Sequence, residues 1–257
     1  MIFTSPGEVA LTVCGFDIYY YGIFLAIAIC VSIFCANYVA DRYYHYNNII
    51  LDVSPYILSF GVIGARLYYC ILNYNYYFTT PIEFFAIRNG GLSIHGAIFA
   101  GALTLLYYCK KNHLNFSKLC DILAIALPLG QAIGRWGNFF NSEAFGIPTT
   151  LPWKLYISPE HRPLEYFNSS YFHPTFLYES LLDLFIFFIM IIILKKNNKF
   201  KSGVLACIYL ILYSLARIFV EYFRIDSNFR ILNIAFPIWI SLLIILFASI
   251  ILFKKIK

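Results

Sequence analysis

The interpretation of this chain starts from one stretch, Gly134-Arg135-Trp136-Gly137-Asn138-Phe139-Phe140-Asn141-Ser142-Glu143-Ala144-Phe145-Gly146. An apolar run, 122–133, precedes it and holds no charged residue. The stretch then brings a guanidinium, two amides and a carboxylate to the end of that run. In a membrane such a group is costly unless its members pair, meet water or bind a ligand. The alternative is a helix end whose polar side chains reach the interface, but the density of polar groups favours a site.

If a helix continues through this stretch, Gln131, Arg135, Asn138 and Ser142 lie on one face of it, because residues three and four apart are neighbours on a helix surface. Glycines at positions 130, 134 and 137 would let a neighbouring helix or a lipid headgroup approach the backbone closely. We therefore expect a polar face at the end of an apolar helix.

Composition places the whole chain in a membrane. Of the 257 residues, 61% are hydrophobic and 12% are charged, whereas soluble domains carry about 25% charged residues. Seven apolar spans are each long enough to cross the hydrocarbon. They are roughly 18–40, 53–72, 92–109, 119–140, 174–194, 203–222 and 234–253. We predict an all-α polytopic fold with about seven transmembrane helices, as a single membrane domain over 1–257.

Loop charge predicts the orientation of these spans. Eleven Lys and Arg residues fall on one side and five on the other, and the remaining three lie inside spans. By the positive-inside rule the C-terminus is cytoplasmic and the N-terminus is extracytoplasmic. The longest connection, 141–173, then lies outside, and a connection of that length is usually functional. We expect it to form a small extracytoplasmic cap.

Several other classes are disfavoured by the sequence. The seven cysteines include no Cys-x-x-Cys pair, so neither a metal site nor a redox framework is expected. The net charge of +6 reflects membrane orientation, and no nucleic-acid partner is expected. Residues 1–17 hold no Lys or Arg, which disfavours a cleaved signal peptide.

The opening stretch resembles the signature of the prolipoprotein diacylglyceryl transferase family: Gly-Arg-x-Gly-Asn-Phe-x-Asn-x-Glu, two residues, then Gly. All eight specified positions are present, which is far more specific than a lone glycine motif. The resemblance continues in order from Tyr21 to Arg224, without a large insertion.

Two of the matching positions lie in the first two spans. The run 19–22 is Tyr-Tyr-Tyr-Gly; an interfacial aromatic belt explains most of it, and Tyr21 is singled out by the family's Tyr-Gly. Arg66 lies inside the second span, where an arginine is a site hypothesis by default. A structural bridge to Asp121 or another acid is the alternative, and the family's arginine here favours neither.

The third span opens with Gly-Gly-Leu-Ser-Ile-His-Gly-Ala at 90–97. Histidine titrates near neutrality and can accept a thiol proton, although a lone histidine beside glycines is more often structural. The match to the family's Gly-Gly-x-Ser-x-His-Gly-Gly favours a functional His95. Ala97 replaces the last glycine of that pattern, which exchanges one small residue for another.

Charged residues also open the fifth span and close the sixth. Glu179 and Asp183 share a helix face and would repel each other unless a cation lies between them or one is protonated. We interpret their segment as mainly structural, with Glu179 as a candidate partner for an intramembrane arginine. Tyr213, Arg217 and Glu221 are spaced four apart, which predicts either a structural ion pair or a second phosphate-binding guanidinium. Both segments resemble the family.

The resemblance implies a bacterial inner-membrane enzyme that starts lipoprotein maturation. It would move the diacylglyceryl group of phosphatidylglycerol onto the lipobox cysteine thiol of a preprolipoprotein signal peptide, giving a thioether and glycerol phosphate. No cofactor is implied, and the partners are these two substrates and the lipid bilayer.

The residues fit that chemistry. Arg135 and Arg217 would stabilise the phosphate leaving group, and His95 would take the thiol proton, with a tyrosine or a water as the alternative base. Tyr21 completes the expected catalytic set. The expected substrate-binding residues, among which Asn138 and Glu143 would orient headgroup hydroxyls and the arginines, are Asn138, Glu143, Gly146, Tyr213, Glu221 and Arg66.

Two other classes of function would account for part of the sequence. A secondary transporter or channel for an anion would also place arginines inside spans. The sequence shows no inverted repeat, however, and its charged groups lie toward the outer ends of the spans. A structural membrane scaffold would leave the polar cluster unexplained.

Overall fold

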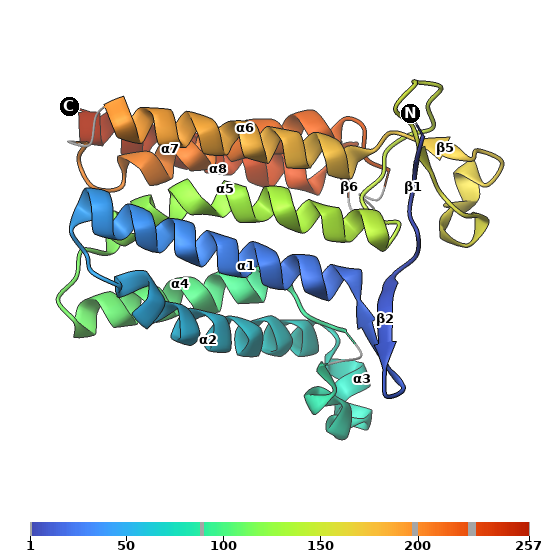
Figure 1. The fold of residues 1–257 in the computed structure, drawn as a ribbon, viewed down its shortest axis with the longest axis horizontal. Coiled ribbons are helices and arrows are strands. Elements are labelled where there is room, and N and C mark those ends of the chain that lie inside the picture. The colour runs from blue at the N-terminus through green and yellow to red at the C-terminus, as the bar shows by residue number, and fades with distance from the viewer. Residues whose placement is uncertain (1, 88–89, 197–199, 226–229, 257) are drawn as a thin grey trace. The chain divides into compact units, whose positions relative to one another are not determined.

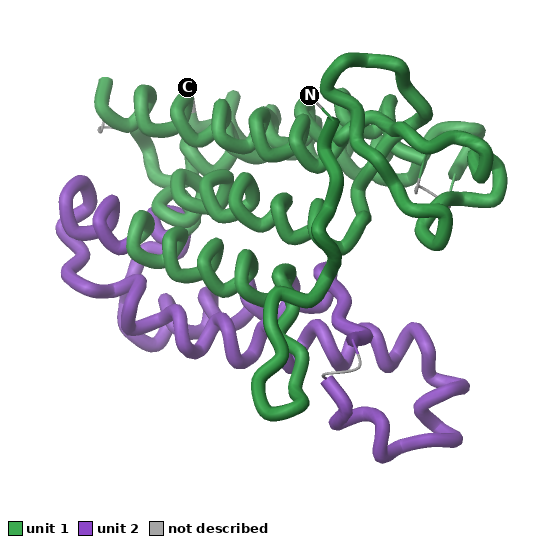
Figure 2. Tube along the Cα trace, turned by 45° about the vertical axis from the view of Figure 1, so that its right-hand side comes forward, with its two compact units in different colours: residues 1–36, 120–257 green, residues 37–119 purple. Residues whose placement is uncertain are grey.

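A computed structural model describes the chain except for residues 1, 88–89, 197–199, 226–229 and 257. Its helices group into two compact units, one made of residues 1–36 with 120–257 and the other of residues 37–119 (Figure 2). We call them the first and the second unit.

Long helices coincide with all seven predicted spans, which confirms the all-α fold class. Six of the described helices are long and apolar enough to cross a membrane. The seventh span corresponds to α4, which has 18 residues and ends in Lys110 and Lys111. Its rise of about 27 Å is slightly below the hydrocarbon thickness of about 30 Å. The seven helices are α1 (Tyr20–Val39), α2 (Ile49–Leu72), α4 (Ile94–Lys111), α5 (Phe116–Phe140), α6 (Thr175–Lys196), α7 (Val204–Glu221) and α8 (Phe236–Ile256).

The second unit is built on the packing of α2 against α4, which lie side by side (Figure 1). Small residues, Gly61 and Ala65 on α2 and Gly96 on α4, are buried, as is usual where membrane helices approach closely. The remaining elements of the unit are the π-helical turn η1 (Ala40–Tyr44), α3 (Tyr74–Thr79) and the 3₁₀ helix η2 (Pro81–Phe85).

The first unit holds α5, α6, α7 and α8, with α7 packed against both α6 and α8. A three-stranded sheet stands beyond the end of α5 (Figure 1). Its central strand β4 (Leu155–Tyr156) is parallel to β1 (Phe3–Thr4) and antiparallel to β5 (Tyr171–Phe172). The smaller elements are the hairpins β2 (Val9–Val13) with β3 (Phe16–Tyr19) and β6 (Arg230–Ile231) with β7 (Ile234–Ala235), and the 3₁₀ helices η4 (Pro159–His161) and η5 (Leu164–Tyr166).

The predicted cap segment, 141–173, has its own small hydrophobic core. That core includes Phe139 from the last turn of α5 and Phe176 from the first turn of α6, both buried. Burial of such aromatic side chains is among the larger stabilising contributions in a fold. The signature stretch therefore anchors the cap to the helices. The buried members are Phe139, Ala144, Phe145, Leu155, Ile157, Phe172 and Phe176.

Basic residues and the cap occupy opposite ends of the helices of the first unit. Lys195 and Lys196 end α6, and Lys254 and Lys255 lie in the last turn of α8, away from the sheet (Figure 1). Three charges used in the orientation argument, Arg88, Lys199 and Lys257, lie outside the described residues.

Candidate functional site

The helix α5 carries the signature to its C-terminal end. It ends at Phe140, so Gln131, Arg135 and Asn138 lie within it. Ser142 lies beyond the helix with a φ of 53°. The conditional prediction of one continuous helix face therefore holds to Asn138 and is wrong at Ser142, because the backbone turns into the cap.

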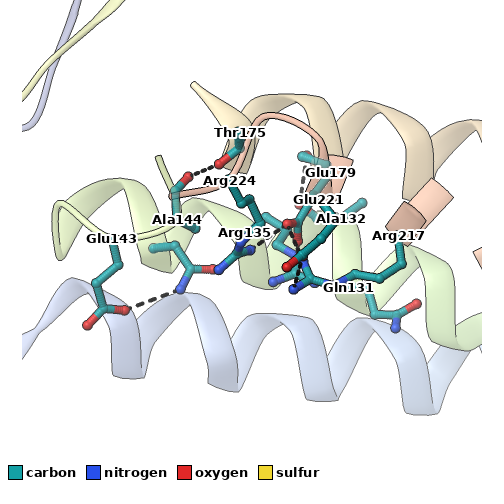
Figure 3. A network of polar contacts seen from close by, with 12 residues as sticks. Gln131, Ala132, Arg135, Glu143, Ala144, Thr175, Glu179, Arg217, Glu221 and Arg224 are labelled. Carbon is teal, nitrogen blue, oxygen red and sulfur yellow. Dashed lines mark hydrogen bonds and ion pairs between the residues drawn. The ribbon is translucent and has the colours of Figure 1, made fainter. Parts of the chain in front are cut away.

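A single buried carboxylate, Glu179 on α6, gathers three arginines (Figure 3). Its Oε2 lies 2.6 Å from Nε of Arg135. Its Oε1 accepts hydrogen bonds from Nη1 of Arg217 at 3.0 Å and Nη1 of Arg224 at 2.6 Å. Glu179 is 5% exposed, and a buried charge needs such partners. The prediction that Glu179 pairs with an intramembrane arginine is confirmed.

The predicted pair of Arg217 with Glu221 is also present. Nη2 of Arg217 lies 2.8 Å from Oε2 of Glu221, one helical turn along α7. Both terminal nitrogens of Arg217 are therefore engaged by carboxylates, one on its own helix and one on α6. This arrangement fixes the guanidinium plane, which suits a group that must meet a ligand in one orientation.

A small pocket opens beside these ion pairs; about 210 Å³ there is free of protein atoms, a volume that includes open solvent at its mouth. The residues that face it come from α5, α6 and α7, within the first unit. They lie in the half of each helix nearer the cap. The lining residues are Arg135, Glu179, Leu182, Asp183, Tyr213, Ala216, Arg217 and Val220.

Arg135 differs from Arg217 in how many of its donors are in use. Its Nε pairs with Glu179, and its terminal nitrogens have no hydrogen bond or ion pair to the part of the chain that the structure describes. The side chain is 23% exposed and lines the pocket. A guanidinium fixed at Nε and open at its terminal nitrogens presents the planar pair of donors that binds a phosphate.

Other predicted residues of the signature lie near α5 but not around Glu179. Nδ2 of Asn138 donates to Oε2 of Glu143 at 3.3 Å. Neither side chain has a hydrogen bond or ion pair with Arg135 among the described residues. Tyr21, at the start of α1, packs its ring against the backbone of α5, since a Cβ at Gly137 would lie 2.9 Å from that ring.

Gly146 lies where the cap meets the end of α7. Its N–H donates to the carbonyl of His173 at 2.8 Å. A Cβ at this position would come within 2.6 Å of the carbonyl oxygen of Phe223 and 2.9 Å of Thr175. Protein backbone therefore approaches Gly146 closely. Its role in substrate binding stays a prediction.

Two predicted site residues belong to the second unit. His95 lies in the first turn of α4, exposed, with its ring centroid 6.3 Å from that of Tyr68. Arg66 on α2 is 4% exposed and donates to the carbonyls of Glu83, Phe84, Gly90 and Gly91. All three nitrogens of Arg66 are thus engaged, and these contacts brace the segment before α4. Its assignment to substrate binding stays a prediction.

Sequence reasoning assigned no site role to two residues that the structure brings to this cluster. Arg224 appeared only as the last position of the family spacing, and it contacts Glu179. Asp183 was noted for its spacing from Glu179, and it faces the pocket. That i, i+4 spacing was the available signal, because two acids on one buried helix face require cations nearby. Among the described residues, no group of three His, Cys, Asp or Glu could hold a metal ion.

Comparison with known proteins agrees with the motifs. A sequence model of the family described as prolipoprotein diacylglyceryl transferase matches residues 8–254. The phosphatidylglycerol–prolipoprotein diacylglyceryl transferase of Synechococcus sp. (strain CC9902) is 45% identical over 230 residues, which cover 88% of this chain and 82% of that protein. The proteins of the same name from Nostoc sp. (strain PCC 7120 / SAG 25.82 / UTEX 2576) and Prochlorococcus marinus (strain MIT 9301) are 43% and 40% identical, over 88% and 86% of this chain and 81% and 80% of theirs.

Proposed function

This chain belongs to the prolipoprotein diacylglyceryl transferase family, and we propose that it transfers the diacylglyceryl group of phosphatidylglycerol to the lipobox cysteine thiol of a preprolipoprotein. The membership replaces the alternative of an anion transporter or channel. The membership also supports a transferase activity. It does not by itself show that the polar cluster is the site of that activity.

The hydrogen-bond partners of Arg135 support placing the active site at this cluster. Its Nε is held by Glu179, its terminal nitrogens have no partner among the described residues, and the side chain lines a pocket. We infer that these nitrogens bind the phosphate of phosphatidylglycerol. Arg217 lines the same pocket with its plane fixed by two carboxylates and adds positive charge close to that phosphate. Donors that are oriented before the reaction stabilise a charged leaving group without reorganising.

The reaction then balances with one base. The cysteine sulfur attacks the glyceryl carbon that carries the phosphate ester, and the carbon–oxygen bond to phosphate breaks. Glycerol phosphate leaves with the electron pair, and the thioether remains on the peptide. The thiol proton goes to His95, because a thiol with a pKa near 8.5 is mostly protonated at neutral pH.

The remaining predicted residues have supporting roles in this proposal. Glu221 and Tyr213 hold Arg217 and the wall of the pocket. Asn138, Glu143 and Tyr21 contact the substrates at the end of α5. Gly146 and Arg66 would act on substrate binding only indirectly, through the backbone segments that they contact.

We place the protein in the bacterial inner membrane, with its N-terminus and the cap outside the cytoplasm. The basic ends of α6 and α8 support this orientation. This orientation requires that α4 cross the membrane as well as the other six helices. Only an odd number of spans places the two termini on opposite sides. A reporter inserted in 147–172 should be accessible from outside the cytoplasm, and a cytoplasmic signal there would reject the orientation.

Transfer can be tested directly with the purified protein in detergent. Incubation with phosphatidylglycerol and a synthetic lipobox peptide should add one diacylglyceryl group to the peptide, as read by mass spectrometry. The same peptide with serine in place of cysteine is the control and should stay unmodified. A peptide that gains no mass in the presence of folded protein would reject the proposed reaction.

A further inference from the structure

Asp183 has no role in the reaction as described so far, yet it is the least satisfied acid of the pocket. It is 3% exposed, and its Oδ2 is buried without a hydrogen-bond partner among the residues that the structure describes. A buried acceptor left without a donor costs about 1–3 kcal/mol, and more when it is charged. Such a group at the wall of a pocket indicates that a donor arrives from elsewhere.

The other acids of the first unit's helices show the contrast. Glu179 contacts three arginines. Asp121 accepts N–H groups of Gly203 and Ala206 at the start of α7, at 2.5 and 2.8 Å. Oε2 of Glu179 and Oε2 of Glu221 also lack a hydrogen bond among the described residues, but each has an arginine nitrogen within 2.8 Å. Asp183 has no such ion pair among the described residues, and it faces the pocket that Arg135 also lines.

The position of Asp183 defines the ligand group that could supply the donor. It follows Glu179 by one helical turn on α6, a rise of about 6 Å, and Glu179 holds the Nε of Arg135. A phosphate bound to the terminal nitrogens of Arg135 would therefore lie close to the carboxylate of Asp183. A phosphate monoanion in a diester has no donor of its own, whereas the glycerol attached to it has two hydroxyl groups.

We propose that Asp183 accepts a hydrogen bond from a hydroxyl of the headgroup glycerol, and so selects phosphoglycerol over other phosphate esters of similar size. This inference rests on the proposed function, because it needs the phosphate to lie on Arg135. The selection follows from the polarity of the site: a pocket built to receive a hydroxyl leaves its own acceptor unpaired when an analogue lacks that hydroxyl.

Two soluble probes test the inference without a lipid or a peptide. Glycerol 1-phosphate and propyl phosphate have the same charge and chain length, and only the first has hydroxyl groups. Their affinities for the purified full-length protein in detergent can be measured by calorimetry. We expect the wild-type protein to bind glycerol 1-phosphate about tenfold more tightly or better, the range for a hydrogen bond to a charged group.

Asp183→Leu should remove this preference and leave the affinity for propyl phosphate within about twofold of wild type. The matched control is Ser180→Ala on the same helix, since the Ser180 hydroxyl donates to the carbonyl of Ala132; it should keep the preference. Asp183→Asn, which retains an acceptor oxygen, should keep part of it and provides a second variant close to the native shape.

The outcomes separate the two proposals. If neither probe binds to the wild-type protein, the phosphate site is rejected, and the role of Asp183 with it. If both bind equally to wild type, only the role of Asp183 is rejected, and that result needs no variant to fold. A preference that survives in Asp183→Leu overturns the inference as well.

Discussion

Arg135 and Arg66 are both arginines within membrane helices, and their surroundings separate a binding group from a brace. Arg66 donates through Nε and both terminal nitrogens to four backbone carbonyls of the second unit. Arg135 pairs through Nε alone with a carboxylate, and its side chain lines a pocket of the first unit. The number of donors left unused, rather than the depth in the membrane, indicates which arginine meets a ligand.

We expect the largest effect at Glu179, the carboxylate that holds the Nε of Arg135. Glu179→Gln leaves three guanidiniums around a neutral amide. Removing one partner of a buried ionic network typically costs about 3–5 kcal/mol, so we expect a large fall in the apparent melting temperature in detergent. The control is Glu165→Gln, on η5 of the cap. Equal melting temperatures for wild type and Glu179→Gln would show that the network does not hold the site.

The next prediction concerns His95, the proposed base that takes the thiol proton. As general base its loss should lower transfer about 100-fold or more at neutral pH. Raising the pH should partly restore the rate of His95→Gln, because bulk hydroxide then forms the thiolate from a group whose pKa is near 8.5. The measurement is transfer rate against pH with the lipobox peptide, for the variant and the wild type.

Two results would contradict that role. Wild-type rates in His95→Gln across the pH range would remove His95 from the mechanism. A rate that is low at every pH, in a protein with a normal melting temperature, would assign His95 to binding a substrate or positioning a neighbour.

Matched lysine substitutions test the two arginines against each other. Arg135→Lys keeps the charge and loses the planar fork, so transfer should fall about 10- to 100-fold with little change in melting temperature. Arg66→Lys loses several carbonyl contacts, so it should cost about 1–3 kcal/mol of stability and leave the rate of the remaining folded protein near wild type. The opposite pattern, a stable Arg66→Lys with little activity, would make Arg66 a binding residue.

These contrasts also show how far sequence alone reaches. Apolar run length predicted the seven helices, because burial in hydrocarbon demands about 20 apolar residues whatever the tertiary packing. The Arg217–Glu221 pair was predictable because both partners lie on one helix. The convergence of three arginines on Glu179 depends on which helices neighbour one another, and the sequence of one chain holds no local signal for that.

The carbonyl partners of Arg66 were unpredictable for a related reason. Glu83 and Phe84 lie in the short 3₁₀ helix η2, and Gly90 and Gly91 have positive φ angles. A hydrophobic period in the sequence indicates neither conformation.

The predicted span ends at 140, as α5 does. The helix face drawn on to Ser142 was wrong because the cap draws Phe145 and Phe172 into its core, and tertiary packing of this kind overrides the local preference of a helix to continue.

Coupling within the site should be smaller than the loss of Glu179. Arg217 has a second carboxylate partner in Glu179, so Glu221→Gln still leaves one ion pair. A double-mutant cycle with Arg217→Gln and Glu221→Gln should give a coupling free energy of about 1–2 kcal/mol in thermal or denaturant unfolding. Strict additivity of the two changes would show that the 2.8 Å contact contributes no net interaction.

The smallest effect is expected at Gly134 and Gly137, two glycines of α5 that flank Arg135. One of them has a close neighbour and the other does not. A Cβ at Gly137 would meet the ring of Tyr21 at 2.9 Å, whereas a Cβ at Gly134 meets no described atom within 4 Å. Alanine is favoured over glycine inside a helix by up to about 1 kcal/mol, so Gly134→Ala should raise the melting temperature slightly and Gly137→Ala should lower it. If the open side of Gly134 is where a substrate approaches, Gly134→Ala should also slow transfer severalfold despite its greater stability. A more stable Gly134→Ala with an unchanged rate would place the substrates elsewhere along the helix.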